Sequence, residues 1–206
     1  MIQEFKEEMM KTFEMMNLGM MHYFLGIEVD HNKRTFISQK KYAKNLLKKF
    51  KMDYYKLVTT SLVTNEKLLK EDGAKTADLS LYRSRVGRLL YLIATQPDIM
   101  YATSLLSRFM QSPNQIHFGA TKRILRYLRG TTNYGIWYQP SAMAKLIGYT
   151  DSDWAGSADD RRSTTNYAFT LGFEIFSWAS KNQESVAQST MEVEYVATAT
   201  TTSQAI

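Results

Sequence analysis

The spacing of apolar residues changes along this 206-residue chain from the period of a helix to that of a strand. From 82 to 130, apolar side chains recur every three or four positions, which predicts three consecutive helices. After that, alternating runs predict strands at 145–153, 166–172 and 174–179, and a last helix begins near Ser189. Helices and strands in separate blocks predict an α+β protein.

The N-terminal part is predicted to contain a helix, a hairpin and a second helix. Apolar residues in 2–16 recur at helical spacing, and strand-like runs at 21–31 and 34–39 flank a polar turn. Ser38 is placed to cap a lysine-rich helix that reaches Phe50.

Proline and glycine mark the limits of the three central helices, which follow a polar connection at 52–78. Pro97 suits the first turn of the second helix, Ser112 followed by Pro113 suits the start of the third, and Gly130 suits its end. The residues predicted to face inward from the first two helices are Tyr82, Val86, Leu89, Leu90, Ile93, Ile99, Ala102, Leu106 and Phe109.

The stretch 131–144 is polar and rich in turn-forming residues. We place a domain boundary there. The chain is thereby divided into 1–140 and 141–206.

The chain carries a net charge of +6, from 26 basic and 20 acidic residues, which favours a polyanionic partner. Cysteine is absent, which excludes disulfides, thiolate metal sites and cysteine catalysis. The first residues lack the apolar core of a secretory signal, and no apolar run is long enough to span a membrane. We therefore expect no membrane partner and a cytoplasmic or nuclear location.

One predicted helix, at 114–129, concentrates positive charge. Lys122, Arg126 and Arg129 fall on one face, with Arg123 beside them. Such a stripe could follow the phosphates of a nucleic-acid duplex without reading its sequence. The alternative is an ordinary solvated helix face.

Two acidic residues about forty positions apart point to a metal site. Asp151 ends a strand-like run, and Glu194 lies early in the last helix. Singly, each reads as a solvated residue. Together, on a strand and on the helix that follows three strands, they could supply half of a two-metal site for phosphodiester hydrolysis. Asp153 and Glu192 flank them and are expected to have structural or supporting roles.

Ordered sequence blocks along nearly the whole chain resemble the Pol polyprotein of copia-type retrotransposons. The blocks are LGMMHYFLGIEVD, ISQKKYAKNLLKKF, YRSRVGRLLYLIATQPDIMYATSLLSRFM, TKRILRYLRGT, GYTDSDWAGSADDRRST and FSWASKNQESVAQSTMEVEY. The resemblance implies that 1–140 form the reverse transcriptase palm tail, thumb and connection. It implies that 141–206 form the first half of a ribonuclease H domain, a truncated mixed sheet with one helix.

The same resemblance assigns chemistry to the two acids. Asp151 matches the first ribonuclease H carboxylate and Glu194 the second, so both are candidate catalytic residues and ligands of Mg²⁺, with an RNA–DNA hybrid or duplex as partner. The family's remaining metal-binding acids are expected beyond residue 206, and the polymerase aspartates before Met1. We therefore expect a catalytically incomplete fragment that at most binds nucleic acid. Departures from the family pattern occur at Gln96, Asn166, Asn182 and Met191.

A different motif lies within the basic helix. Residues Arg123, Ile124, Leu125 and Arg126 satisfy the RxLR pattern of secreted oomycete effectors, which act inside plant cells. That pattern normally follows a signal peptide near the N-terminus. The tetrapeptide thus suggests an alternative function, that of an effector co-opted from a retroelement fragment. Such an effector would be delivered into the host cell and its nucleus and would suppress defence by binding host proteins.

Overall fold

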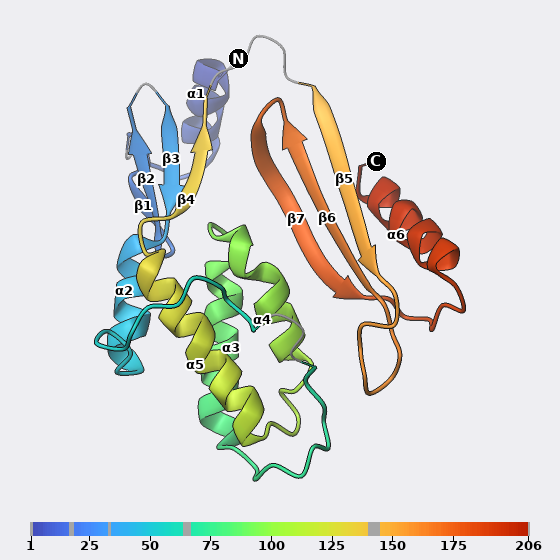
Figure 1. Cartoon of the computed structure of the whole chain (residues 1–206). Helices are drawn as coiled ribbons and strands as arrows, with labels where there is room; N and C mark the ends of the chain where they lie inside the picture. Colours follow the sequence, from blue (N-terminus) through green and yellow to red (C-terminus); the bar gives the residue numbers. More distant parts are fainter. Residues whose placement is uncertain (1, 17–18, 33, 64–66, 140–144, 206) are drawn as a thin grey trace.

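The computed structural model describes residues 2–16, 19–32, 34–63, 67–139 and 145–205, and it confirms an α+β fold. Figure 1 shows a small sheet beside a group of helices, and a second sheet with one helix on its outer side. None of the helices in these ranges is long and apolar enough to cross a membrane.

The first sheet has the strand order β1-β2-β3-β4 and is antiparallel throughout. Its strands are β1 (Tyr23–Phe24), β2 (Ile27–His31), β3 (Thr35–Ser38) and β4 (Gly135–Tyr138). The strand predicted over 21–31 is broken in two by a tight turn. Leu25 and Gly26 both have positive φ (46° and 81°), as the central residues of a two-residue hairpin require.

The prediction that 131–144 is only a polar boundary is wrong at β4, which pairs with β3 over four residues. The partner strand lies about a hundred positions earlier, so local composition could not reveal the pairing. Residues 140–144, where the boundary was placed most closely, lie outside the described residues.

Helix α2 (Lys40–Lys49) is not capped by Ser38, because Ser38 is the last residue of β3. The N-cap position is Gln39, whose side chain makes no capping bond. Instead, the Glu28 carboxylate on β2 accepts a hydrogen bond of 2.9 Å from the Lys41 backbone N–H. The cap therefore comes from tertiary structure.

The core lies among α2, α3 (Leu79–Leu92), α4 (Met100–Ser107) and α5 (Gln115–Gly130), with a 3₁₀ turn, η1 (Pro97–Ile99), before α4. The predicted inward stripes are largely confirmed, whereas Leu90 is 39% exposed. The apolar residues with no measurable exposure are Tyr82, Val86, Leu89, Leu92, Ile99, Leu106, Ile124, Leu125 and Leu128.

Helix α5 is capped by Asn114 and not, as predicted, by Ser112. The Asn114 side chain accepts from the His117 backbone N–H at 2.9 Å, and the Asn114 N–H donates to His117 Nδ1 at 3.2 Å. The His117 ring is fully buried and stacks on Phe109 with centroids 3.8 Å apart. Imidazole thus takes the place of the Glu or Gln of a usual capping box.

This cap predicts that acid destabilises the protein. Burial lowers the pKa of His117, so the folded protein holds the ring neutral, whereas the unfolded chain takes up a proton near pH 6.5. Stability should be complete above that pH and decline as the pH falls below it. Urea unfolding at pH 8 and pH 5 measures the change. The His117→Gln variant should reduce it, and His22→Gln, at an exposed position, should not.

The second sheet is formed by β5 (Leu146–Asp153), β6 (Thr164–Leu171) and β7 (Glu174–Asn182), in that order. The resemblance implied a mixed sheet, but the pairing of these three strands is antiparallel. Helix α6 (Thr190–Ala205) packs against β5 and begins at the predicted Ser189 cap. Ser189 Oγ accepts from the Glu192 N–H at 3.3 Å, and the Glu192 carboxylate accepts from the Gln188 N–H at 2.8 Å.

Direct hydrogen bonds join the second sheet to the helical part and to β4 of the first sheet. Trp178 Nε1 donates to the Ile93 carbonyl at 3.1 Å, and the Tyr138 hydroxyl donates to the Ile175 carbonyl at 2.9 Å. The sheet therefore docks on the helices through its β7 side (Figure 1).

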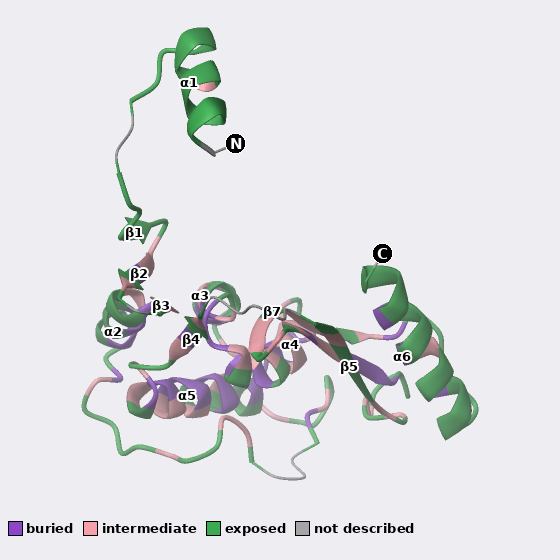
Figure 2. Ribbon diagram, turned by 90° about the horizontal axis from the view of Figure 1, so that it is seen from above, coloured by how far each residue is buried: buried purple, intermediate pink, exposed green. Residues whose placement is uncertain are grey.

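Helix α1 (Ile2–Thr12) ends earlier than predicted and stands apart from the remaining elements (Figure 2). Phe5 and Phe13, on its predicted apolar face, are 60% and 56% exposed. The helical spacing was therefore correct, but it did not identify a face buried within this chain.

Candidate functional site

Asp151 and Glu194 meet at one hollow on the surface. Asp151 lies on β5, Glu194 lies in the second turn of α6, and both carboxylates are exposed. The hollow has a volume of about 240 Å³. The residues that line it are Thr150, Asp151, Ser152, Glu194, Ala197 and Thr198.

Helix α6 is held over the second sheet by hydrogen bonds on both sides of Glu194. Thr201 Oγ1 and Thr150 Oγ1 are 3.0 Å apart, which joins the end of the helix to the strand. The buried Gln183 amide donates to the Val193 carbonyl at 3.1 Å, one residue before Glu194. One bond thus joins α6 directly to β5, and the other joins α6 to the residue that follows β7.

Asp151 lies on β5, an outer strand of the described sheet. Because Thr150 bonds to α6, the alternation of side chains directs Asp151 to the other face of β5, and the two acids share the hollow as lining residues. Asn166, directly across on β6, donates from Nδ2 to Asp151 Oδ2 at 3.4 Å. Asn166 stands where the resemblance expects glycine, so this contact comes from the departure itself.

The flanking acids have structural roles. An oxygen of Asp153 accepts a short hydrogen bond from the Thr164 backbone N–H, which closes the end of the β5–β6 connection. Glu192 accepts from the backbone ahead of α6. Neither residue lines the hollow.

The hollow offers only oxygen donors, which are the ligands that Mg²⁺ prefers. Two carboxylates and three hydroxyl groups, from Thr150, Ser152 and Thr198, are available. Among the described residues there is no group of three or more His, Cys, Asp or Glu side chains that could hold a metal ion. The donor set therefore fits one ion that keeps most of its own water.

The arginines of α5 hold a loop of the same chain. Arg126 donates to the Lys56 carbonyl at 2.7 Å, and Arg129 donates to the Tyr55 carbonyl at 2.6 Å. Arg123 donates to Thr60 Oγ1 at 2.8 Å. We call these three bonds the arginine clasp. The guanidinium groups predicted to bind phosphates are thus engaged with residues 55–60.

Lys122, the fourth member of the predicted stripe, is exposed, and its ammonium group lies 5.2 Å from the centre of the Phe118 ring. The other two residues of the RxLR-like tetrapeptide, Ile124 and Leu125, have no measurable exposure. Within α5 this tetrapeptide is therefore a helical segment that belongs partly to the core and partly to the clasp.

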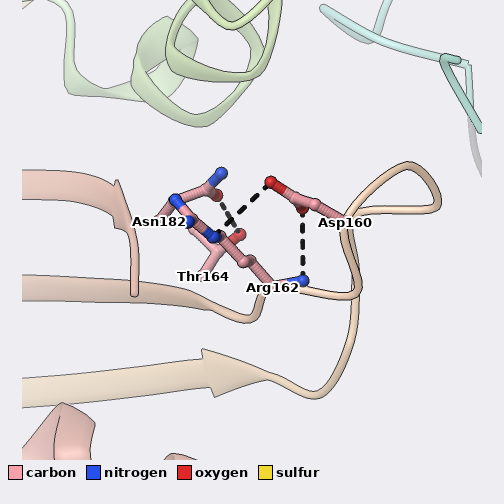
Figure 3. A network of polar contacts seen from close by, with 4 residues as sticks. All are labelled: Asp160, Arg162, Thr164 and Asn182. Carbon is pink, nitrogen blue, oxygen red and sulfur yellow. Dashed lines mark hydrogen bonds and ion pairs between the residues drawn. The ribbon is translucent and has the colours of Figure 1, made fainter. Parts of the chain in front are cut away.

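The remaining departures from the family pattern lie away from the hollow. Gln96 is buried and donates to the Thr131 carbonyl at 2.7 Å, and Met191 is 75% exposed. Asn182 accepts from Thr164 Oγ1 at 3.5 Å (Figure 3). These three departures therefore bear on packing and on the surface, and not on Asp151 and Glu194.

Sequence reasoning missed a second hollow, of about 100 Å³, between α4 and the β5–β6 connection. Its charged lining comes from segments far apart in sequence: Lys67, Lys70, Arg108, Asp159 and Asp160. Asp159 and Asp160 are adjacent in the sequence. No local pattern joins them to the three cations, because folding alone brings these segments together.

The comparisons with known proteins give a consistent result. No family model and no solved structure matches the chain. It is 44% identical over 185 residues to the retrovirus-related Pol polyprotein from transposon RE1 of Arabidopsis thaliana, which covers 89% of this chain and 13% of that polyprotein. The chain therefore spans about one eighth of this relative's length.

Two shorter relatives are matched over most of their length. The uncharacterized mitochondrial protein AtMg00810 of Arabidopsis thaliana is 40% identical over 199 residues, which are 96% of this chain and 82% of that protein. Secreted RxLR effector protein 161 of Plasmopara viticola is 44% identical over 126 residues, 61% of this chain and 89% of that protein. The ordered sequence blocks and these likenesses agree: over most of its length the chain is homologous to a segment of the retrovirus-related Pol polyproteins from copia-type transposons.

Proposed function

We propose that this chain is the part of a retrotransposon Pol polyprotein that joins the end of the reverse transcriptase to the start of the ribonuclease H domain. Residues 1–140 would supply the palm tail, thumb and connection, and 141–206 the first strands and first helix of the nuclease. The observation that carries the proposal is the hollow shared by Asp151 and Glu194, on the strand and helix expected for the first two nuclease acids.

In this proposal Asp151 and Glu194 hold Mg²⁺, which when bound activates water and stabilises the leaving oxygen of a phosphodiester. The chain itself orients the two carboxylates through the Thr150–Thr201 and Gln183–Val193 contacts. With two carboxylates, the ion keeps most of its water and binds weakly. The described residues would therefore bind nucleic acid without hydrolysing it.

Metal binding by the two acids can be measured with Mn²⁺ as a paramagnetic substitute. We expect Mn²⁺ to broaden the backbone NMR signals of Thr150 and Thr198 in the native protein. The Asp151→Asn, Glu194→Gln double variant should lose this broadening. A Glu8→Gln, Glu14→Gln variant removes the same charge at exposed positions and should keep it.

Hydrolysis is tested with the same two proteins and an RNA–DNA hybrid in Mg²⁺. We expect the hybrid to remain intact with both. Cleavage of the RNA strand by the native protein, abolished in the double variant, would show that two carboxylates suffice and would overturn the incomplete-site part of the proposal. Equal broadening by Mn²⁺ in both proteins would remove the metal site itself.

A second candidate function is that of a secreted effector that acts on plant proteins, because one relative is named an RxLR effector. The burial of Ile124 and Leu125 argues against an accessible RxLR signal in the folded chain. Expression in leaves of the native protein and the Asp151→Asn, Glu194→Gln variant separates the two. An effector should alter cell death equally with both, and a Pol segment should alter it with neither.

A further inference from the structure

The hollow between α4 and the β5–β6 connection is bounded by cations from two separate segments. Arg108 comes from the end of α4, and Lys67 and Lys70 come from the connection before α3. Leu68 is buried between the two lysines, and the Lys70 backbone N–H donates to both Asp159 carboxylate oxygens, at 3.0 and 3.1 Å. These contacts anchor the backbone at Leu68 and at Lys70.

The two acids at this hollow already have partners. Asp159 accepts from the Lys70 backbone, as above. Asp160 accepts from the Arg162 backbone N–H at 3.3 Å and forms an ion pair with its guanidinium at 3.6 Å (Figure 3). Hydrogen bonding by Ser157 and the charge of Arg162 lower the pKa of Asp160, so it stays ionised within this network.

Within the part of the chain that the structure describes, no acid partners the Arg108 guanidinium in this way. It is half-buried, and Nη2 donates to the neutral Thr164 hydroxyl at 2.9 Å, whereas no ion pair to it is found among the described residues. Burial lowers the pKa of Arg108, and the charges of Tyr101, Asp153 and Asp160 oppose that shift. A desolvated cation beside a cavity is stabilised by an anion that enters it.

Size and charge define that anion. A cavity of about 100 Å³ holds about three water molecules, or one tetrahedral oxyanion in their place. The charged lining of three cations and two acids gives 3 − 2 = +1, and both acids are occupied by other donors.

We propose that Arg108, Lys67 and Lys70 form a phosphate-binding site. Arg108 would donate to the phosphate oxygens from the floor, and the two ammonium groups would close over them from the connection. The phosphate can come from a nucleic-acid backbone or from free phosphate. The nucleic-acid source rests on the proposed function. This end of the sheet is close in sequence to the proposed nuclease acids, since Asp153 lies only two residues beyond Asp151 on β5.

The test uses inorganic phosphate and the Lys67→Ala, Lys70→Ala variant, which leaves the Lys70–Asp159 backbone contact intact. At constant ionic strength, phosphate should shift the backbone NMR signals of Gly156 and Ser157 in the native protein. The shift should be lost in this variant and kept in Lys6→Ala, Lys11→Ala, which removes equal charge from the exposed α1. Unmoved signals, or equal shifts in all three proteins, would overturn the site.

A short fluorescent RNA–DNA hybrid then distinguishes the source. For a backbone phosphate, the Lys67→Ala, Lys70→Ala variant should bind about fivefold more weakly, and its slope of log affinity against log salt should fall by about 1. Phosphate-induced shifts with unchanged hybrid affinity would support the site and assign it to free phosphate. If the native protein binds no hybrid but keeps its phosphate shifts, the proposed function fails and the site stands.

Discussion

Replacing Leu125 with alanine is expected to lower the free energy of unfolding by about 3 kcal/mol. The side chain has no measurable exposure and belongs to the core cluster formed by α2, α3, α4 and α5. The loss combines the transfer of the side chain with the cavity that remains, since a closely packed interior relaxes only in part. Urea unfolding at neutral pH measures the difference.

Two further variants test whether Leu125 acts through burial in the core or as part of a recognition signal. Leu90→Ala removes the same atoms from a side chain that is 39% exposed, and it should cost markedly less. Leu125→Met breaks the RxLR pattern but conserves volume, with an expected cost below about 1.5 kcal/mol. If Leu125→Met abolished a leaf response while the protein stayed folded, the tetrapeptide would be a recognition signal and not a piece of the core.

Replacing Gly135 with alanine is expected to destabilise the protein by about 1–3 kcal/mol, because the added methyl group has no space. Its Cβ would lie 2.7 Å from Cζ of Phe36 and closer still to the Ile37 carbonyl oxygen, within the β3–β4 ladder. The backbone oxygen cannot move aside without breaking that pairing. Thermal or urea unfolding gives the magnitude.

Gly119 provides the matched control with the opposite sign. It lies exposed in α5, and an added Cβ would meet nothing within 4 Å. Alanine there should stabilise the protein by about 0.5–1 kcal/mol, since glycine is a poor residue for a helix interior. A Gly135→Ala protein as stable as Gly119→Ala would mean that β4 is not paired as described.

Local pattern predicted the elements whose stability is local. The stripes of α3 and α4, the start of α6 at Ser189 and the three strands after residue 145 follow from periodicity and caps within a few positions. Long-range partners decided the errors. Glu28 caps α2 at Lys41, thirteen residues later in the chain. The residues of β4 form a strand because they pair with β3.

The candidate functional residues also divide into those that local pattern predicts and those that long-range contacts decide. The spacing of strand and helix was enough to predict that Asp151 and Glu194 would lie close together, and they line one hollow. The charge on α5 was predicted to face phosphates, but the sequence could not reveal that Arg126 and Arg129 bind loop carbonyls of the same chain. The cavity beside Arg108 could not be predicted from the sequence either, because the segments that line it are brought together only by tertiary contacts.

The arginine clasp makes residues 55–60 an internal competitor for any polyanion that approaches α5. Hydrogen bonds to charged groups are worth about 1.5–3 kcal/mol each, so phosphates must displace bonds already formed before they gain from these guanidinium groups. The net charge of +6 consequently overstates the number of cations that are free to release counterions. If residues 55–60 detached, the guanidinium groups of α5 would be free to bind phosphates. The loop thus controls how many cations this face of the helix presents to a polyanion.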